Sequence, residues 1–146
     1  MRDAAYYIEK YDMVELPEGG YFAPLVRGEF SIPKEILGEN YSSDRESVSI
    51  IYYLLESGDI SKWHMLRSEE HWLWHDGGKI EITISEDEGF KEFRRLVLDP
   101  YEGDFCASVP AGYWQTAKVI EGDFCLVTCV VSPAYHDDEI FFLEEK

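Results

Sequence analysis

Long apolar runs and basic residues are what this sequence most clearly lacks. No stretch approaches the roughly 20 apolar residues that a membrane-spanning helix needs, and residues 1–12 lack the uninterrupted apolar segment of a secretory signal. Thirteen Lys and Arg stand against 30 Asp and Glu, which gives a net charge of −17. Such a surface repels phosphate backbones and anionic lipids, so we expect neither nucleic acid nor a membrane as a partner. These absences predict a soluble, cytoplasmic protein.

Cysteine is also scarce, with Cys106, Cys125 and Cys129 as the complete set. The odd number predicts free thiols. On a strand, Cys125 and Cys129 would lie about 13 Å apart, beyond the roughly 7 Å limit on the Cα separation of a disulfide. We interpret all three as small core residues; a reactive or metal-binding role is the alternative. CxxC pairs, a nucleophile elbow and a phosphate-binding loop are absent, which argues against a structural zinc site, an α/β-hydrolase and a P-loop nucleotide-binding protein.

What is present predicts one β-rich domain over residues 1–146. Apolar residues make up 45% of the chain and aromatic residues 15%, enough to build a core. Alternating or β-branched segments predict strands, and the clearest alternation is Ile80, Ile82 and Ile84. Gly77-Gly78 is predicted to end a strand and Gly122-Asp123 to form a turn. About eight to ten short strands are expected, the strongest at 47–57, 60–66, 70–76, 79–85, 94–99 and 124–132. Helix is expected only at 1–12, as a turn within 31–46, and as an alternative to a strand near the C-terminus. The pattern indicates an all-β sandwich or barrel.

The residues with most chemical potential lie between 60 and 78. Three of the four histidines and three of the four tryptophans fall in ISKWHMLRSEEHWLWHDGG. Imidazoles and carboxylates among aromatic walls are typical of a small-molecule pocket, although each residue alone could equally be a core or surface residue.

Two short motifs in this region and beyond resemble those of cupins. His64, Glu70 and Gly77 have much of the spacing of the first cupin motif, and PAGYWQ (110–115) has the form of the second. Five ordered segments resemble one single-domain cupin branch of unknown function, over about residues 13–143. They are PEGGYF (17–22), SIIYYLL (49–55), SKWHMLRSEEHWLWHDG (61–77), VPAGYWQTA (109–117) and CVVSP (129–133). The resemblance implies a double-stranded β-helix, the RmlC-like jelly-roll barrel, with minor helical segments. It also implies a homodimer.

The sequence departs from the cupin motifs at two metal-binding positions. Leu66 and Gln115 stand where the family commonly has histidines. We therefore expect no cofactor. A divalent metal, if one binds, would bind weakly through His64, Glu70 and Gln115.

The resulting functional hypothesis is a metal-independent isomerase or epimerase acting on a sugar-like or nucleotide-like small molecule. His64 and Glu70 are the expected catalytic acid–base pair. Residues expected to contact the ligand are Ser61, Trp72, Trp74, His75 and Gln115. Two alternatives stay open: a non-catalytic ligand-binding or sensing cupin, and a metal-dependent enzyme with a degenerate site.

Strand alternation makes these expectations testable. If Glu70 faces the barrel interior, Trp72 and Trp74 should too, while His71 faces outward. The same rule places Gln115 inside and Trp114 outside. His136 and the acidic run at 137–139 are expected to be solvated.

Overall fold

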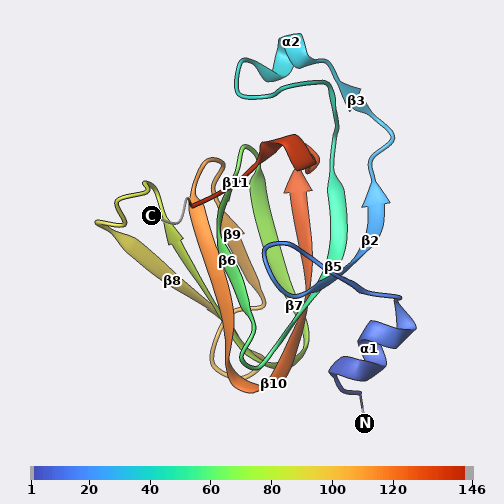
Figure 1. The fold of residues 1–146 in the computed structure, drawn as a ribbon, viewed down its shortest axis with the longest axis vertical. Helices are drawn as coiled ribbons and strands as arrows, with labels where there is room; N and C mark the ends of the chain where they lie inside the picture. Colours follow the sequence, from blue (N-terminus) through green and yellow to red (C-terminus); the bar gives the residue numbers. More distant parts are fainter. Residues whose placement is uncertain (1, 144–146) are drawn as a thin grey trace.

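Nine strands form one continuous antiparallel sheet that curls over on itself (Figure 1). The computed structural model describes residues 2–143. The helices are α1 (Ala4–Lys10), α2 (Lys34–Leu37) and the 3-10 turn η1 (Asp137–Glu139). The strands are β1 (Val14–Glu15), β2 (Tyr21–Arg27), β3 (Ser31–Ile32), β4 (Arg45–Glu46), β5 (Ser49–Glu56), β6 (Ile60–Leu66), β7 (Glu69–Ser85), β8 (Phe93–Leu98), β9 (Cys106–Val109), β10 (Trp114–Ser132) and β11 (Ile140–Phe142). The small pair β3–β4 is separate from the nine-stranded sheet. The all-β jelly-roll prediction is confirmed.

The two long strands β7 and β10 belong to both layers of the barrel. They pair with each other along most of their length. The first part of β10 also pairs with β6, and its second part pairs with β5. Likewise β9 pairs with the first part of β7, and β8 pairs with its second part. One layer therefore has the order β1-β2-β5-β10-β7-β9, and the other has the order β11-β6-β10-β7-β8.

Glycines bend β7 and β10 without ending them. The prediction of a strand end at Gly77-Gly78 and of a turn at Gly122-Asp123 is therefore wrong. Gly77 and Gly122 have φ angles of +100° and +92°, which favour glycine. A Cβ atom on Gly78 would overlap the carbonyl oxygen of Glu121, so the two backbones approach too closely for any side chain. The ladder thus continues through the bend from one layer to the other.

The main core lies between the two layers. Ile80, Ile82 and Ile84 are 0–1% exposed, as their alternation predicts, and they pack with Leu55 and Val127. Burial of such a side chain stabilises the fold by roughly 1.5–3 kcal/mol. The thiols of Cys125 and Cys129 are free and buried, as expected; Cys106 is exposed, which corrects its assignment to the core.

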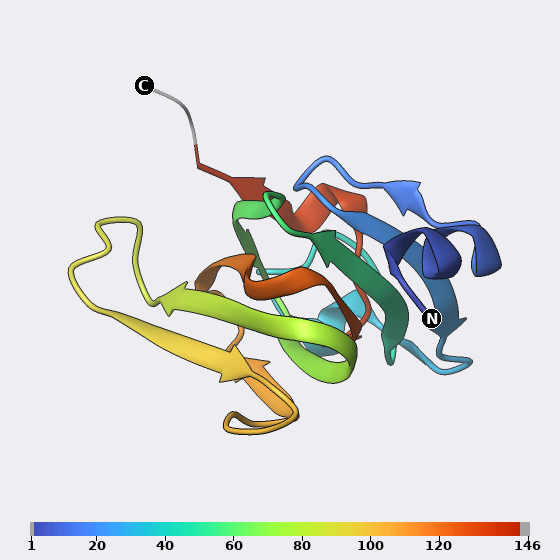
Figure 2. The same cartoon turned by 90° about the horizontal axis from the view of Figure 1, so that it is seen from below.

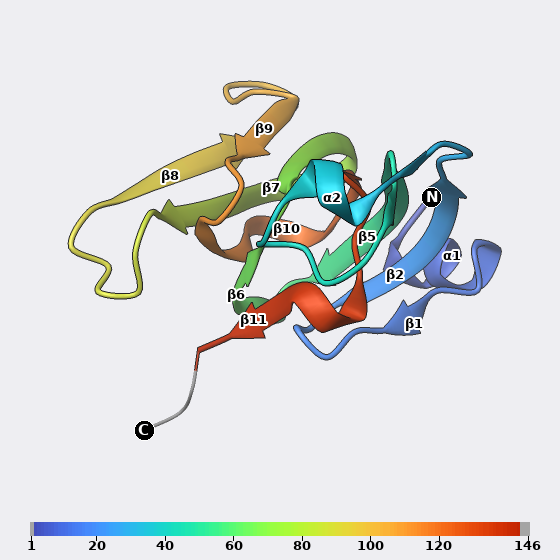
Figure 3. The same cartoon turned by 90° about the horizontal axis from the view of Figure 1, so that it is seen from above.

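Three segments cover the outside of the barrel. Helix α1 packs through Tyr7 near β5 and β10, on the side opposite the β7–β8 hairpin (Figure 2). The excursion that carries β3, α2 and β4 lies over one end of the barrel (Figure 3). Residues 133–143 cross the same region. Within residues 2–143, every helix is too short or too polar to span a membrane.

Candidate functional site

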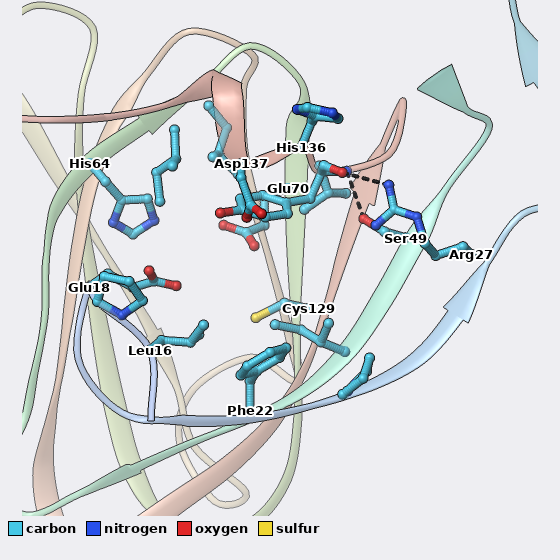
Figure 4. A pocket seen from close by; sticks show the side chains of 17 residues that line it. Leu16, Glu18, Phe22, Arg27, Ser49, His64, Glu70, Cys129, His136 and Asp137 are labelled. Atoms are coloured by element: carbon cyan, nitrogen blue, oxygen red, sulfur yellow. Dashed lines mark hydrogen bonds between the residues drawn. The ribbon is translucent and has the colours of Figure 1, made fainter. Parts of the chain in front are cut away.

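A cavity of about 330 Å³ lies inside the barrel (Figure 4). Strands β2, β5, β6, β7 and β10 supply most of its wall. Two segments outside the main sheet complete it: the turn after β1 and the segment after β10. Figure 4 shows His64 and the carboxyl groups of Glu18, Glu70 and Asp137 around one half of this space, with Phe22 in the other half.

His64 reaches the cavity from β6 and is 5% exposed. Its Nδ1 lies 2.6 Å from the carbonyl oxygen of Lys62. A carbonyl only accepts hydrogen bonds, so Nδ1 carries the proton in the neutral ring and Nε2 is left as an acceptor. Burial lowers the pKa of His64, although the bond to Lys62 acts in the opposite direction. His64 is therefore a neutral imidazole with a free basic nitrogen at neutral pH.

Glu70 reaches the same cavity from β7 and is 7% exposed. Burial raises the pKa of its carboxyl group to about 7; Glu18 adds to this, and a hydrogen bond from Gln115 opposes it. The Oε1 atom is buried and has no hydrogen-bond partner among residues 2–143. Glu70 is thus divided between its protonated and ionised forms near neutral pH and can give or take a proton.

A second carboxyl group, Glu18, lines the cavity and was not predicted. It lies on the turn that follows β1, where the amide of Lys62 donates to its carbonyl oxygen at 2.6 Å. The hydroxyl of Tyr53 donates to the carbonyl of Gly19 and fixes the turn from the other side. Burial raises the pKa of Glu18, and Asp137 contributes. The sequence marks this turn through its Pro and Gly residues, but nothing local shows that it enters the barrel.

The segment after β10 supplies Tyr135, His136 and Asp137. The Tyr135 amide donates to Ser49 Oγ at 2.8 Å, and Arg27 donates to the Tyr135 carbonyl at 2.7 Å, as Figure 4 shows. The expectation that this segment is solvated is confirmed for Asp137 and Asp138, which are exposed, and is wrong for Glu139, which is 7% exposed. His136 is half-buried, and these bonds fold the segment so that His136 and Asp137 line the cavity. Burial and the neighbouring Asp137 raise the pKa of Tyr135.

The tryptophans do not form the cavity walls, which corrects the expected ligand-stacking role. Trp72 and Trp74 do face the same way as Glu70, but both pack in the main core. Trp72 is 2% exposed and donates from Nε1 to Gln115 Oε1 at 3.1 Å. Trp74 donates to the Gly78 carbonyl at 2.9 Å. Trp74 is half-buried and packs against the edge of the core, and neither ring lines the cavity.

The remaining predicted ligand contacts also lie outside the cavity lining. Gln115 is buried behind Glu70 and holds it through a hydrogen bond. Ser61 is 1% exposed and lies within the barrel wall. His75 lies on the outer surface, where its ring bonds the Thr128 hydroxyl. Of the seven residues predicted for the site, the structure therefore brings two, His64 and Glu70, into the cavity.

The other alternation predictions can be checked in the same way. His71 faces outward, as expected, and its Nδ1 lies 2.8 Å from Ser108 Oγ. Trp114 is 6% exposed, so this single chain already buries it.

The residues at the cavity do not fit a catalytic metal centre. Such a site usually has three good protein ligands. Within residues 2–143, His, Cys, Asp and Glu side chains form no group of three or more that could hold a metal ion. The carbonyl oxygen of Gln115, the remaining expected donor, already accepts the indole N–H of Trp72. The chemistry considered below therefore depends on protein side chains alone.

Comparisons with known proteins agree with this fold. The family model described as "Cupin superfamily (DUF985)" matches residues 5–143. Searching the curated proteins gives no match. A hypothetical protein from Leishmania major has a similar structure, with a TM-score of 0.85, 23% identity, and coverage of 97% of this chain and 88% of that one. A protein from Shewanella oneidensis gives a TM-score of 0.84 with 27% identity, covering 99% of this chain and 86% of that one. The capsular polysaccharide assembling protein CapF from Staphylococcus aureus gives 0.65 with 14% identity, covering 92% of this chain and 32% of that one.

Proposed function

Because the chain belongs to the DUF985 family of the cupin superfamily, we propose that its barrel cavity binds a small polar metabolite and isomerises or epimerises it by proton transfer. The observation that carries the proposal is the pairing of His64 and Glu70. Both side chains are more than nine-tenths buried, come from different strands and line the same cavity. One offers a basic nitrogen, and the other can hold a proton at neutral pH.

The proposed reaction moves protons and needs no other reactant. The Nε2 atom of His64 removes a proton from a carbon next to a carbonyl group, and the C–H electron pair moves toward the carbonyl oxygen. Protonated Glu70 stabilises that oxygen by donating a hydrogen bond or its proton. Return of the proton to the opposite face of the carbon gives an epimer, whereas its return to the original face regenerates the substrate. In an α-hydroxy carbonyl compound, Glu70 passes its proton to the carbonyl oxygen and takes one from the neighbouring hydroxyl group, and return of the C–H proton to the former carbonyl carbon gives an isomer. The product has the same composition as the substrate, and both side chains return to their starting states.

Gln115 is a positioning residue in this scheme. Its side chain is 1% exposed and bonds both Trp72 and Glu70. It therefore links the Glu70 carboxyl group to the rigid core between the layers. A catalytic group is most effective when its own partners fix its direction.

The cavity favours a sugar-like ligand over a nucleotide-like one. A volume of about 330 Å³ is near the lower end of ligand pockets, which span roughly 300–1,000 Å³. Glu18, Glu70 and Asp137 all line it, and ionised carboxylates repel the phosphates of a nucleotide. A small uncharged or cationic metabolite with a carbonyl group is the better match.

Deuterium uptake tests the reaction before the substrate is identified. The protein is incubated in deuterated water with a panel of aldoses, ketoses, amino sugars and keto acids. Mass spectrometry then detects the metabolite that gains deuterium at carbon. We expect uptake with the wild-type protein, and a loss of roughly 100-fold or more in His64→Ala and Glu70→Gln. His71→Ala is the matched control, because His71 faces outward on the same strand as Glu70.

Two results would contradict the proposal. One is undiminished uptake in His64→Ala. The other is a wild-type protein that binds a member of the panel without catalysing any uptake, which would favour the non-catalytic binding module.

A further inference from the structure

We propose that the cavity is built for a ligand with a positive charge: a small protonated amine held between Glu70 and Glu18, whose carbon body packs against Phe22 and Leu16. This inference rests on the proposed function for the location of the site. It goes further in naming the chemical class of the ligand. An amino sugar is one molecule that has both the ammonium group required here and the carbonyl group required by the proposed reaction.

The first argument is that two buried carboxylate oxygens have nothing to bind. Glu70 Oε1 and Glu18 Oε2 have almost no contact with solvent, and neither has a hydrogen-bond partner among residues 2–143. A buried polar atom without a partner destabilises the fold, and a charged one does so more strongly. Both side chains line the cavity and point into it in Figure 4. A ligand that donates hydrogen bonds from a single ammonium group can satisfy both oxygens.

The second argument is the charge of the surroundings. Besides Arg27, the titratable groups that interact electrostatically with Glu70 or share its cavity are Glu18, Tyr53, His64, Cys129, Tyr135, His136 and Asp137. Burial keeps His64 neutral, and the ring of His136 is engaged by its own segment, where Nδ1 accepts the amide of Asp138 at 3.1 Å. An ammonium group on the ligand supplies the positive charge that these carboxyl groups lack, and its binding shifts Glu70, which is divided between its two forms near neutral pH, toward the ionised form.

Arg27 is the one guanidinium that lines the cavity among residues 2–143, and it is engaged elsewhere. It lies at the rim with 46% of its side chain exposed. Its Nη2 donates to Glu46 at 3.1 Å and to the Tyr135 carbonyl at 2.7 Å. It therefore holds the wall of the cavity in place and leaves Glu18 and Glu70 without a cation.

The third argument is the apolar part of the cavity wall. Leu16, Phe22, Pro24 and Ile51 also line the cavity. Figure 4 shows Phe22 in the half that lies away from Glu70 and Asp137. Such a surface favours carbon and C–H groups over further charges. The cavity thus has one acidic and one apolar end, which matches a short organic amine.

Three probes of nearly the same shape test the inference: benzylamine, benzyl alcohol and benzoate. Isothermal titration calorimetry at neutral pH measures their binding to the intact protein. We expect benzylamine to bind about tenfold or more tightly than benzyl alcohol, because its hydrogen bonds are charge-assisted, and benzoate to bind most weakly. Glu18→Gln should remove most of this preference and leave the affinity for benzyl alcohol nearly unchanged. Glu86→Gln, on the exposed loop after β7, is the matched control.

The outcomes separate this inference from the proposed reaction. Benzyl alcohol or benzoate binding as tightly as benzylamine would overturn it, as would the absence of benzylamine binding at millimolar concentration. Glu70→Gln repeats the test if Glu18→Gln does not fold. A preference for amines without deuterium uptake would leave the ligand class standing and refute the reaction. Deuterium uptake by neutral sugars, without any preference for amines, would support the proposed reaction and refute the inference about the ligand class.

Discussion

At the scale of single residues, the buried carboxyl group of Glu70 makes the stability of the fold depend on pH. Burial raises the pKa of its carboxyl group from 4.5 to about 7. Each pH unit is equivalent to about 1.4 kcal/mol, so the ionised group in the folded protein costs roughly 3 kcal/mol above neutral pH. Between pH 4.5 and about 7 the folded state binds more protons than the unfolded state. The free energy of unfolding contributed by this group therefore falls as the pH rises through that window.

Glu70→Gln should remove this dependence. We expect the advantage of the variant over the wild type, in free energy of unfolding, to grow by roughly 2–3 kcal/mol between about pH 5 and pH 8. Urea unfolding at a series of pH values measures the difference and cancels the titration of other groups. Glu86→Gln should show no such trend. A constant difference between wild type and Glu70→Gln across the series would show that Glu70 ionises as an ordinary carboxyl group.

At the scale of elements, the bends in β7 and β10 allow these two paired strands to belong to both layers of the barrel. Gly78 lies at the crossing, where a Cβ atom would overlap the backbone of Glu121 and approach Gly122. The backbone on both sides is locked in the β7–β10 ladder and cannot easily move away. At Gly78, glycine is needed because there is no room for a Cβ atom. At Gly58 there is room, since no atom lies within 4 Å of the Cβ position, and glycine is needed only because its φ angle is +92°.

Gly78→Ala should therefore destabilise the fold more than Gly58→Ala. We expect a loss of roughly 3 kcal/mol or more in the free energy of unfolding for Gly78→Ala, because the clash is between backbones. For Gly58→Ala we expect about 1–2 kcal/mol, the usual cost of a left-handed non-glycine residue. Equal losses in chemical denaturation would mean that the crossing can open to admit a methyl group.

At the scale of the whole molecule, two segments far apart in the sequence close one end of the barrel together. Arg45, in the excursion between β2 and β5, lies 2.5 Å from Glu139 in the segment after β10. Their side chains are 0% and 8% exposed. Burial raises the pKa of Glu139, but hydrogen bonds from Ser42 and Arg45 outweigh it and lower the pKa overall. The stabilisation is therefore present above the ordinary carboxyl pKa and is lost as the pH falls through the lowered value.

Arg45→Met should have a large effect, because it leaves Glu139 buried without a countercharge. We expect a loss of roughly 3–5 kcal/mol in the free energy of unfolding at neutral pH. The control is Arg95→Met, whose side chain is 62% exposed and lies 3.9 Å from Glu81; here we expect a change of about 1 kcal/mol or less. Similar effects of the two substitutions in thermal or urea unfolding would contradict the structural role given to the buried pair.

Much of the fold could be predicted because it depends on local pattern. The alternation of Ile80, Ile82 and Ile84 identifies a half-buried strand by itself, since side chains on a strand point to opposite faces in turn. The same rule correctly places His71 outside. What local pattern could not show is that Gly77-Gly78 bends a strand within a ladder. A glycine pair favours a turn and a bend equally, and only the close approach of Glu121 distinguishes them.

The sequence by itself determined the all-β class through its alternating segments, and its resemblance to cupins implied the jelly-roll barrel that the structure has. Strand alternation and motif spacing also predicted that His64 and Glu70 share an interior, and both line the cavity. Only the tertiary structure decided what surrounds that pair. Glu18 and Asp137 enter through contacts between distant segments, such as Tyr53 with Gly19 and Tyr135 with Ser49. Trp72 and Trp74, expected to form the walls, pack in or against the core instead, where their indole N–H groups bond Gln115 and the Gly78 carbonyl.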